Sequence, residues 1–124
     1  MKFRYARHTN HLEPIIQFYT SILEFEILGS FKNHEGYDGV FLGLPEENWY
    51  LEFTVSWQQP LHRPDEDDFL VFYPESEAAF NRALKNMLHM NIKASTPQNP
   101  YWKKNGVMML DPDGYGVVIV KPGS

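Results

Sequence analysis

Two stretches of the sequence share one pattern of apolar and polar residues. Residues 39–54 and residues 106–120 each read as a strand, a turn that contains proline, and a second strand. Earlier in each half, apolar residues recur at helical spacing, over about residues 11–22 in the first half and after Pro74 in the second. A repeated unit of this kind must bury its sheet face, so the repeat predicts an α+β fold of two βαβββ modules. The modules are expected to form a curved mixed sheet around a cavity, with the helices outside.

The same pattern divides the chain along its length. Strands are predicted at residues 3–9, 25–31, 40–44, 49–55, 69–73, near Ile92, 107–110 and 115–121. Residues 57–67 carry two prolines and no periodicity, so they are predicted to link a module of about residues 1–56 to one of about residues 68–121. Both modules are expected to belong to a single domain over residues 1–124.

Local signals mark the helix ends and one turn. Asn10 is expected to cap the first helix, because its side chain can accept hydrogen bonds from the first backbone N–H groups. In the second helix, helical spacing places Leu88 among the inward residues. Asp111–Gly114 reads Asp-Pro-Asp-Gly, which predicts a tight turn before the last strand.

Composition narrows the class of protein. The chain has 124 residues, enough for one core, and 43% of them are hydrophobic. Its net charge of −5, without a basic stripe, argues against a nucleic-acid partner. It has no cysteine, which excludes disulfides and thiolate ligands, and no run of about 20 apolar residues that would span a membrane. A cytoplasmic protein with a small-molecule ligand is the expectation.

Several segments together resemble the vicinal oxygen chelate superfamily, which includes glyoxalase I, extradiol dioxygenases and bleomycin-resistance proteins. They are residues 18–25, Glu52 and residues 111–115. A narrower resemblance, to the uncharacterised YycE-like branch, rests on residues 4–9, 34–39, 51–54 and 99–102. The resemblance covers essentially the whole chain. It implies the cup-shaped fold predicted above and a homodimer, and it supplies no activity.

Metal-dependent members of that superfamily use four ligand positions, which the resemblance carries onto Arg4, Glu52, Asp68 and Val118. Only the two carboxylates suit a divalent cation, since Arg4 is a permanent cation and Val118 has no donor atom. A guanidinium beside such an ion would repel it by about 1–4 kcal/mol. The expectation is therefore no metal and no cofactor. The alternative is a divalent ion held by His8, Glu52 and Asp68, a set that suits iron or zinc.

Alternation along the strands selects the candidate ligand-binding residues. Arg4 and His8 share one strand face, and Glu52 lies between two apolar neighbours, so it is expected to face the cavity and pair with Arg4. His34 lies in a turn that contains glycine. A loop over residues 95–102 is expected to form a lid with its aromatic rings. The full set is Arg4, His8, His34, Glu52, Asp68, Asn99, Tyr101 and Trp102.

Three functions fit these observations. The first is metal-independent binding of a small molecule in the central cavity, as in drug-resistance proteins of this fold. The second is a lyase, isomerase or dioxygenase that uses a metal through Glu52, Asp68 and a histidine. The third is a protein that acts through its surface. The sequence leaves open whether the protein is an enzyme, and it identifies no catalytic residue.

Overall fold

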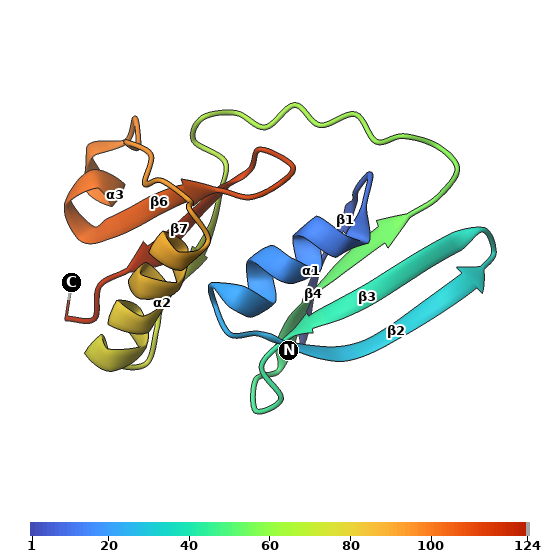
Figure 1. Ribbon diagram of the computed structural model, residues 1–124, viewed down its shortest axis with the longest axis horizontal. Helices are drawn as coiled ribbons and strands as arrows, with labels where there is room; N and C mark the ends of the chain where they lie inside the picture. Colours follow the sequence, from blue (N-terminus) through green and yellow to red (C-terminus); the bar gives the residue numbers. More distant parts are fainter. Residues whose placement is uncertain (124) are drawn as a thin grey trace. The chain divides into compact units, whose positions relative to one another are not determined.

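The computed structural model describes residues 1–123 and divides the chain into two compact units (Figure 1). The first unit spans Met1–Leu61 and the second begins at His62. This boundary falls inside the predicted linker of residues 57–67. Each unit has its own mixed sheet with helices, which confirms the α+β class. The cavity expected where the modules meet, and their union in one domain, stay predictions.

The first unit has the predicted βαβββ order. Its elements are β1 (Phe3–His8), α1 (Leu12–Ser21), β2 (Glu26–His34), β3 (Tyr37–Gly43) and β4 (Trp49–Val55). The strands lie in the order β1-β4-β3-β2, with β1 parallel to β4 and the other pairs antiparallel. The first strand of the unit is thus hydrogen-bonded to its last.

Helix α1 covers one face of this sheet (Figure 1). Its buried residues include Ile15, Phe18 and Tyr19, and the Tyr19 ring stacks on Phe53 of β4 at 5.4 Å between centroids. Because side chains alternate along a strand, the neighbours of the buried residues point to the other face. No helix of the first unit covers that other face within the described residues, and we call it the open face.

The start of α1 differs from the prediction. The helix begins at Leu12, and the capping position is His11, whose side chain makes no capping hydrogen bond. Asn10 lies one residue too early to act as the cap, so that prediction was wrong. None of the helices within residues 1–123 has the length and apolar character that crossing a membrane requires.

The second unit departs from the βαβββ plan. It contains β5 (Phe69–Phe72), α2 (Glu77–His89), α3 (Pro100–Asn105), β6 (Gly106–Leu110) and β7 (Gly116–Val120). Its sheet has the order β5-β7-β6, with β5 parallel and β6 antiparallel to β7. The strand predicted near Ile92 is not present. Instead, Ser95 forms an isolated antiparallel bridge with Met108 of β6.

Proline explains this difference between the units. Pro97 and Pro100 have no backbone N–H, so neither can donate a hydrogen bond to a strand ladder. Pro100 instead occupies the first turn of α3, where its fixed φ favours a helix, and Asn99 precedes it as the cap. The predicted loop of residues 95–102 therefore ends in a helix.

Other local predictions in the second unit have mixed outcomes. The Asp111 side chain accepts hydrogen bonds from the backbone N–H groups of Asp113 (2.9 Å) and Tyr115 (3.1 Å), and Gly114 adopts a φ of 90°. The turn is thus confirmed. On α2, however, Leu88 is 71% exposed, because it lies about 100° around the helix from the buried Met87.

Candidate functional site on the open face

Arg4 and Glu52 form an ion pair on the open face of the first sheet. Arg4 Nη1 donates a hydrogen bond to Glu52 Oε1 at 3.0 Å. In the strand register Arg4 lies opposite Tyr50, so the contact with Glu52 is diagonal across β1 and β4. The Glu52 side chain is 14% exposed and that of Arg4 is 49% exposed. The predicted pairing is therefore confirmed, with the carboxylate half-buried and the guanidinium accessible.

The environment keeps Arg4 charged. The hydrogen bond that Arg4 donates to Glu52 is the main cause that raises the pKa of Arg4 above its ordinary value, and Tyr50 acts in the same direction. Partial burial opposes this effect but does not reverse it. Arg4 therefore carries a positive charge at every pH at which the protein would be studied.

Three aromatic rings, Phe31, Phe41 and Tyr50, form a continuous row across β2, β3 and β4 that we call the aromatic platform. The ring centroids of Phe31 and Phe41 are 5.8 Å apart, and those of Phe41 and Tyr50 are 5.4 Å apart. The guanidinium of Arg4 lies over two of these rings, 5.6 Å from Phe41 and 5.1 Å from Tyr50. These distances are within the range of cation–π attraction.

Two glycines let the rings lie against the sheet. Gly39 lies opposite Phe31 in the register, and a Cβ atom added there would be 2.3 Å from Phe31 Cζ. Gly29 lies opposite Phe41, and a Cβ atom there would be 3.1 Å from Phe41 Cδ2. The absence of side chains at these two positions makes room for the platform.

The charges beside the platform favour an anion. Lys2 Nζ lies 5.2 Å from the centre of the Tyr50 ring, which the Arg4 guanidinium also contacts. Lys2 and Arg4 bring two positive charges, and Glu52 brings one negative charge. A ligand with one acidic group would balance this excess, although the whole chain carries a net charge of −5.

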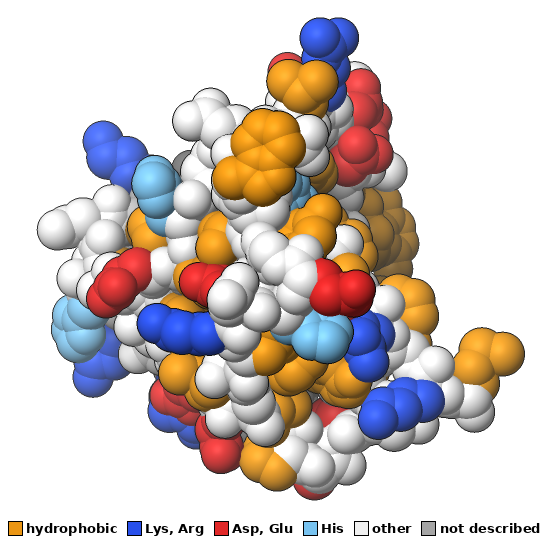
Figure 2. Space-filling view, turned by 90° about the vertical axis from the view of Figure 1, so that its right-hand side faces the viewer, with side chains coloured by type: hydrophobic (Ala, Val, Ile, Leu, Met, Phe, Trp, Pro, Cys, Tyr) orange, Lys and Arg blue, Asp and Glu red, His pale blue; other side chains and the backbone are white. Residues whose placement is uncertain are grey.

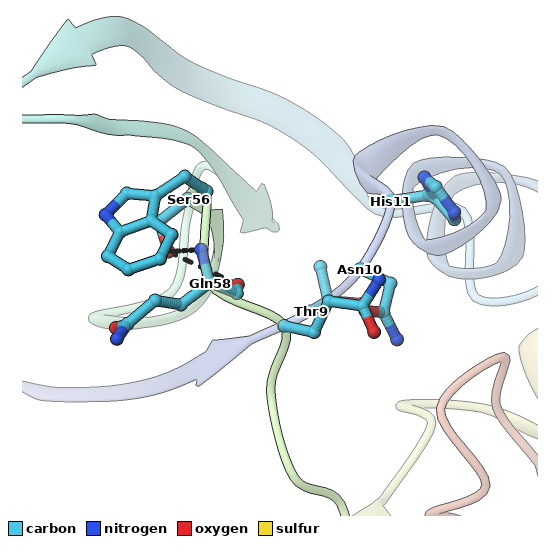
Figure 3. Close-up of a pocket in the computed structure, with 7 residues that line it drawn as sticks. Thr9, Asn10, His11, Ser56 and Gln58 are labelled. Atoms are coloured by element: carbon cyan, nitrogen blue, oxygen red, sulfur yellow. Dashed lines mark hydrogen bonds between the residues drawn. The ribbon is translucent and has the colours of Figure 1, made fainter.

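His8 also lies on the open face, near the end of β1. Its Nε2 atom is 3.0 Å from the hydroxyl of Ser56, and its ring makes an edge contact with Tyr37 at 6.1 Å. Just beyond it lies a pocket of about 380 Å³, between the β1–α1 connection and the residues after β4 (Figure 3). The pocket is lined by Thr9, Asn10, His11, Ser56, Trp57, Gln58 and Gln59.

The remaining residues predicted for the site take other positions. His34 ends β2 and is exposed, with its ring 6.0 Å from Phe31. Asp68 was expected on the first strand of the second module, but it precedes β5, where it accepts a hydrogen bond from the backbone N–H of Asp65. Asn99 accepts a hydrogen bond from the N–H of Tyr101 and so caps α3.

The two aromatic residues of the expected lid lie in a helix rather than in a loop. Tyr101 and Trp102 belong to α3, and their rings lie 4.8 Å apart in an edge contact. Trp102 packs against the apolar core cluster of the second unit, which includes Val118. Tyr101 keeps a largely exposed ring. Trp102 thus contributes to packing in the second unit and Tyr101 is largely exposed, while their contact with a ligand stays a prediction.

The residues at the four superfamily ligand positions do not fit a divalent metal. Arg4 already bonds Glu52, and Val118 is buried among apolar side chains. The carboxylate of Asp68 bonds its own loop. Within residues 1–123, no three His, Asp or Glu side chains form a group that could hold a metal ion.

Sequence reasoning missed the aromatic platform, although a signal for it existed. Tyr50 lies two residues before Glu52 on β4, so the two side chains share one face, and Phe41 lies opposite Glu52 on β3. Each phenylalanine of the platform lies opposite a glycine on the neighbouring strand. The pairing of an aromatic residue with a glycine across two strands becomes visible only when the register is known. The hairpin contains two register shifts, so counting from its turn would not give that register.

Comparisons with known proteins agree with this fold. Residues 3–54 match the YycE-like N-terminal domain, and residues 67–121 match the YycE-like C-terminal domain. The sequence is 37% identical over 120 residues to the uncharacterized protein YycE of Bacillus subtilis, covering 96% of this chain and 86% of that protein. The crystal structure of a Bacillus subtilis YycE protein superposes with a TM-score of 0.85 at 36% identity, covering 99% of this chain and 90% of that chain.

More distant structures share the fold alone. Glyoxalase I of Leishmania major has a TM-score of 0.73 at 20% identity, over 95% of this chain and 84% of that one. A fosfomycin resistance protein FosX from Listeria monocytogenes, in complex with Mn(II) and 1S,2S-dihydroxypropylphosphonic acid, has a TM-score of 0.71 at 9% identity. That comparison covers 95% of this chain and 89% of FosX. These two structures show that the fold expected from the resemblance is the one the chain adopts.

Proposed function

The chain belongs to the YycE-like family, and we propose that it binds small planar acids on the open face of its first sheet without a metal ion. The observation that carries this proposal is the position of Arg4, which is bonded to Glu52 at 3.0 Å and stacked on the aromatic platform. One group thereby offers a fixed positive charge beside an apolar surface. Such a combination suits a molecule with a ring and an acidic substituent.

The guanidinium has donors to spare for a ligand. Arginine carries five N–H groups, and one of its nitrogens, Nη1, bonds Glu52. The side chain is about half exposed, so the other donors are accessible to a carboxylate or a phosphonate. A fork of N–H groups matches the two oxygens of such an anion, which gives both strength and orientation.

Glu52 would act as a positioning residue in this site. It fixes one end of the guanidinium, so a ligand would lose less affinity in ordering that side chain. The aromatic platform would receive the ring of the ligand by offset or edge contact. His8 and His34 lie at the margins of the same face and are proposed to contact the substituents of the ligand.

The candidates in the second unit stay predictions. Tyr101 is the one whose exposed ring suits contact with a ligand, and Tyr101→Ala tests it in the same assay. The side chains of Asp68 and Asn99 accept hydrogen bonds from the backbone N–H groups of Asp65 and Tyr101, so substituting either would change local structure as well as any ligand contact. The predicted homodimer also stays a prediction, which sedimentation of the purified chain tests.

The experiment is calorimetric titration with benzoate and phenylphosphonate, compared with the neutral analogue benzamide. Arg4→Gln should weaken benzoate binding by about tenfold or more, because it removes a charge-assisted hydrogen bond. Arg63→Gln, which removes an exposed charge outside the open face, should leave binding unchanged. Equal affinity for benzoate and benzamide in the original chain would contradict the proposal.

Metal analysis addresses the alternative. Protein purified without a histidine tag should bind benzoate equally well before and after dialysis against a chelator. One tightly held zinc, iron or manganese ion per chain, lost on Glu52→Gln, would favour a metal-dependent lyase, isomerase or dioxygenase instead. The fold relative that holds Mn(II) makes this comparison worthwhile.

A further inference from the structure

The pocket beyond His8 is separate from the platform and has a different chemistry. Figure 3 shows Ser56 and Gln58 on one side, from the segment after β4, and Thr9, Asn10 and His11 on the other, from the β1–α1 connection. All seven lining residues belong to the first unit. The volume of about 380 Å³ is in the range of small-ligand sites.

The lining residues carry no permanent charge. None of the seven is Lys, Arg, Asp or Glu, although such residues make up 22% of the chain. The amide side chains of Asn10, Gln58 and Gln59 can each donate and accept hydrogen bonds. A pocket of this kind solvates neutral hydroxyl groups well and has no cation to hold an acid.

Ser56 is held in a fixed position at the edge of the pocket. Its hydroxyl oxygen lies 3.0 Å from His8 Nε2 and accepts a hydrogen bond from the backbone N–H of Gln58 at 3.3 Å. A second contact, of 3.4 Å, joins the hydroxyl to the carbonyl oxygen of Gln58. These contacts pre-organise one polar group of the pocket, which lowers the entropy lost when a ligand binds.

Trp57 supplies an apolar surface beside these polar groups. Its side chain is 86% exposed, which is unusual for the largest aromatic residue. Large apolar side chains do reach the protein surface elsewhere, where Figure 2 shows them among charged groups of both signs. Trp57 differs because its neighbours in the pocket are neutral hydrogen-bonding groups.

We propose that this pocket binds a neutral polyhydroxylated molecule, such as a monosaccharide or a cyclic polyol. The C–H face of such a molecule would lie on the indole of Trp57, and its hydroxyl groups would bond the amides and Ser56. Polyols are amphipathic in the manner of the pocket, with an apolar face and polar edges. The site is independent of the acid site proposed for the open face.

The test is a calorimetric titration of the full chain with glucose, galactose and myo-inositol. At least one should bind with a Kd of about 1 mM or lower. Trp57→Ala and Gln58→Ala should each weaken that binding by about fivefold or more. Leu61→Ala, which removes another exposed apolar side chain from the same connecting segment, should change it by less than about twofold.

Two further measurements separate this proposal from the previous one. Arg4→Gln should leave polyol binding unchanged, and Trp57→Ala should leave benzoate binding unchanged. Glucose 6-phosphate should bind no more tightly than glucose, because none of the lining residues is Lys or Arg. The proposal is overturned if none of the three polyols binds with a Kd of about 1 mM or lower, or if the phosphate ester binds more tightly.

Discussion

Substitution of Gly39 by alanine is expected to displace one ring of the aromatic platform. The new Cβ would lie 2.3 Å from Phe31 Cζ and 2.4 Å from Phe31 Cε1, while carbon atoms in contact are about 3.5–4.0 Å apart. The Phe31 ring must therefore move away from the sheet. Gly39 does not have a positive φ, so alanine can adopt its backbone conformation without strain.

The size of the effect follows from two opposing terms. Overpacking of this kind costs about 1–3 kcal/mol, whereas alanine in a strand is favoured over glycine by about 0.5–1 kcal/mol. The net loss in the free energy of unfolding should therefore lie between about 0 and 2.5 kcal/mol, with a central value of about 1 kcal/mol. A loss of 1 kcal/mol lowers the Tm of a chain of this size by about 4 °C. Gly29→Ala, with its closest contact at 3.1 Å, should cost less.

A double-mutant cycle isolates the cause. In a Phe31→Ala background the ring is absent, so Gly39→Ala should stabilise the protein by about 0.5–1 kcal/mol. Urea unfolding of the four proteins, followed by far-ultraviolet circular dichroism, measures each free energy. If Gly39→Ala destabilises both backgrounds equally, the ring is not the reason for glycine at this position, and the account of the platform is wrong.

Three other expectations concern charges and a turn. Glu52→Gln should lower the Tm more than Glu46→Gln, which changes an exposed turn residue, because only Glu52 bonds Arg4. Because the pKa of Arg4 is raised, the guanidinium loses its positive charge only above its ordinary pKa. Benzoate affinity should therefore stay level between about pH 6 and 9. Asp111→Ala should cost about 1–3 kcal/mol in urea unfolding, because two backbone N–H groups lose their acceptor, whereas the exposed Asp67→Ala should cost less.

Each of these expectations has a clear contrary result. Equal Tm values for the two glutamine variants would mean that the ion pair adds nothing to stability. A fall in benzoate affinity across neutral pH would point to a histidine rather than Arg4 as the anion-binding group. Similar unfolding curves for the two aspartate variants would show that the turn forms without its side-chain acceptor.

Strand and helix periodicity predicted the order of elements in the first unit, although β2 (Glu26–His34) and β3 (Tyr37–Gly43) differ from the predicted strands at residues 25–31 and 40–44. β4 was predicted at its observed residues, and alternation placed Arg4 and Glu52 on one face before any register was known. A period of two residues decides the face of every side chain once the strand is located. The pairing of β1 with β4 then brought the guanidinium to the carboxylate.

The second unit was predicted less well, because the βαβββ pattern of the first unit was assumed for residues near Ile92 that do not form a strand. Ile92 is a residue type that strands favour, but Pro97 and Pro100, which follow it, cannot donate the backbone hydrogen bonds of a regular strand ladder. The resemblance carried a first-strand ligand position onto Asp68, although that strand was predicted, and lies, from Phe69 onward; at a strand end one residue decides whether a side chain faces a sheet or a turn. Strand ends depend on contacts that a single sequence does not reveal.

The pairing of β1 with β4 has a consequence for biosynthesis. A ribosome releases the amino-terminal strand first, yet its parallel partner is the last strand of the unit to emerge. Until β4 emerges, Arg4 has no Glu52 to pair with. The long loop between β1 and β4 must also close before the two strands can pair, which slows folding. The surface proposed to bind acids would thus exist only after the entire first half has been translated, and benzoate affinity would then report completed folding in truncated nascent chains.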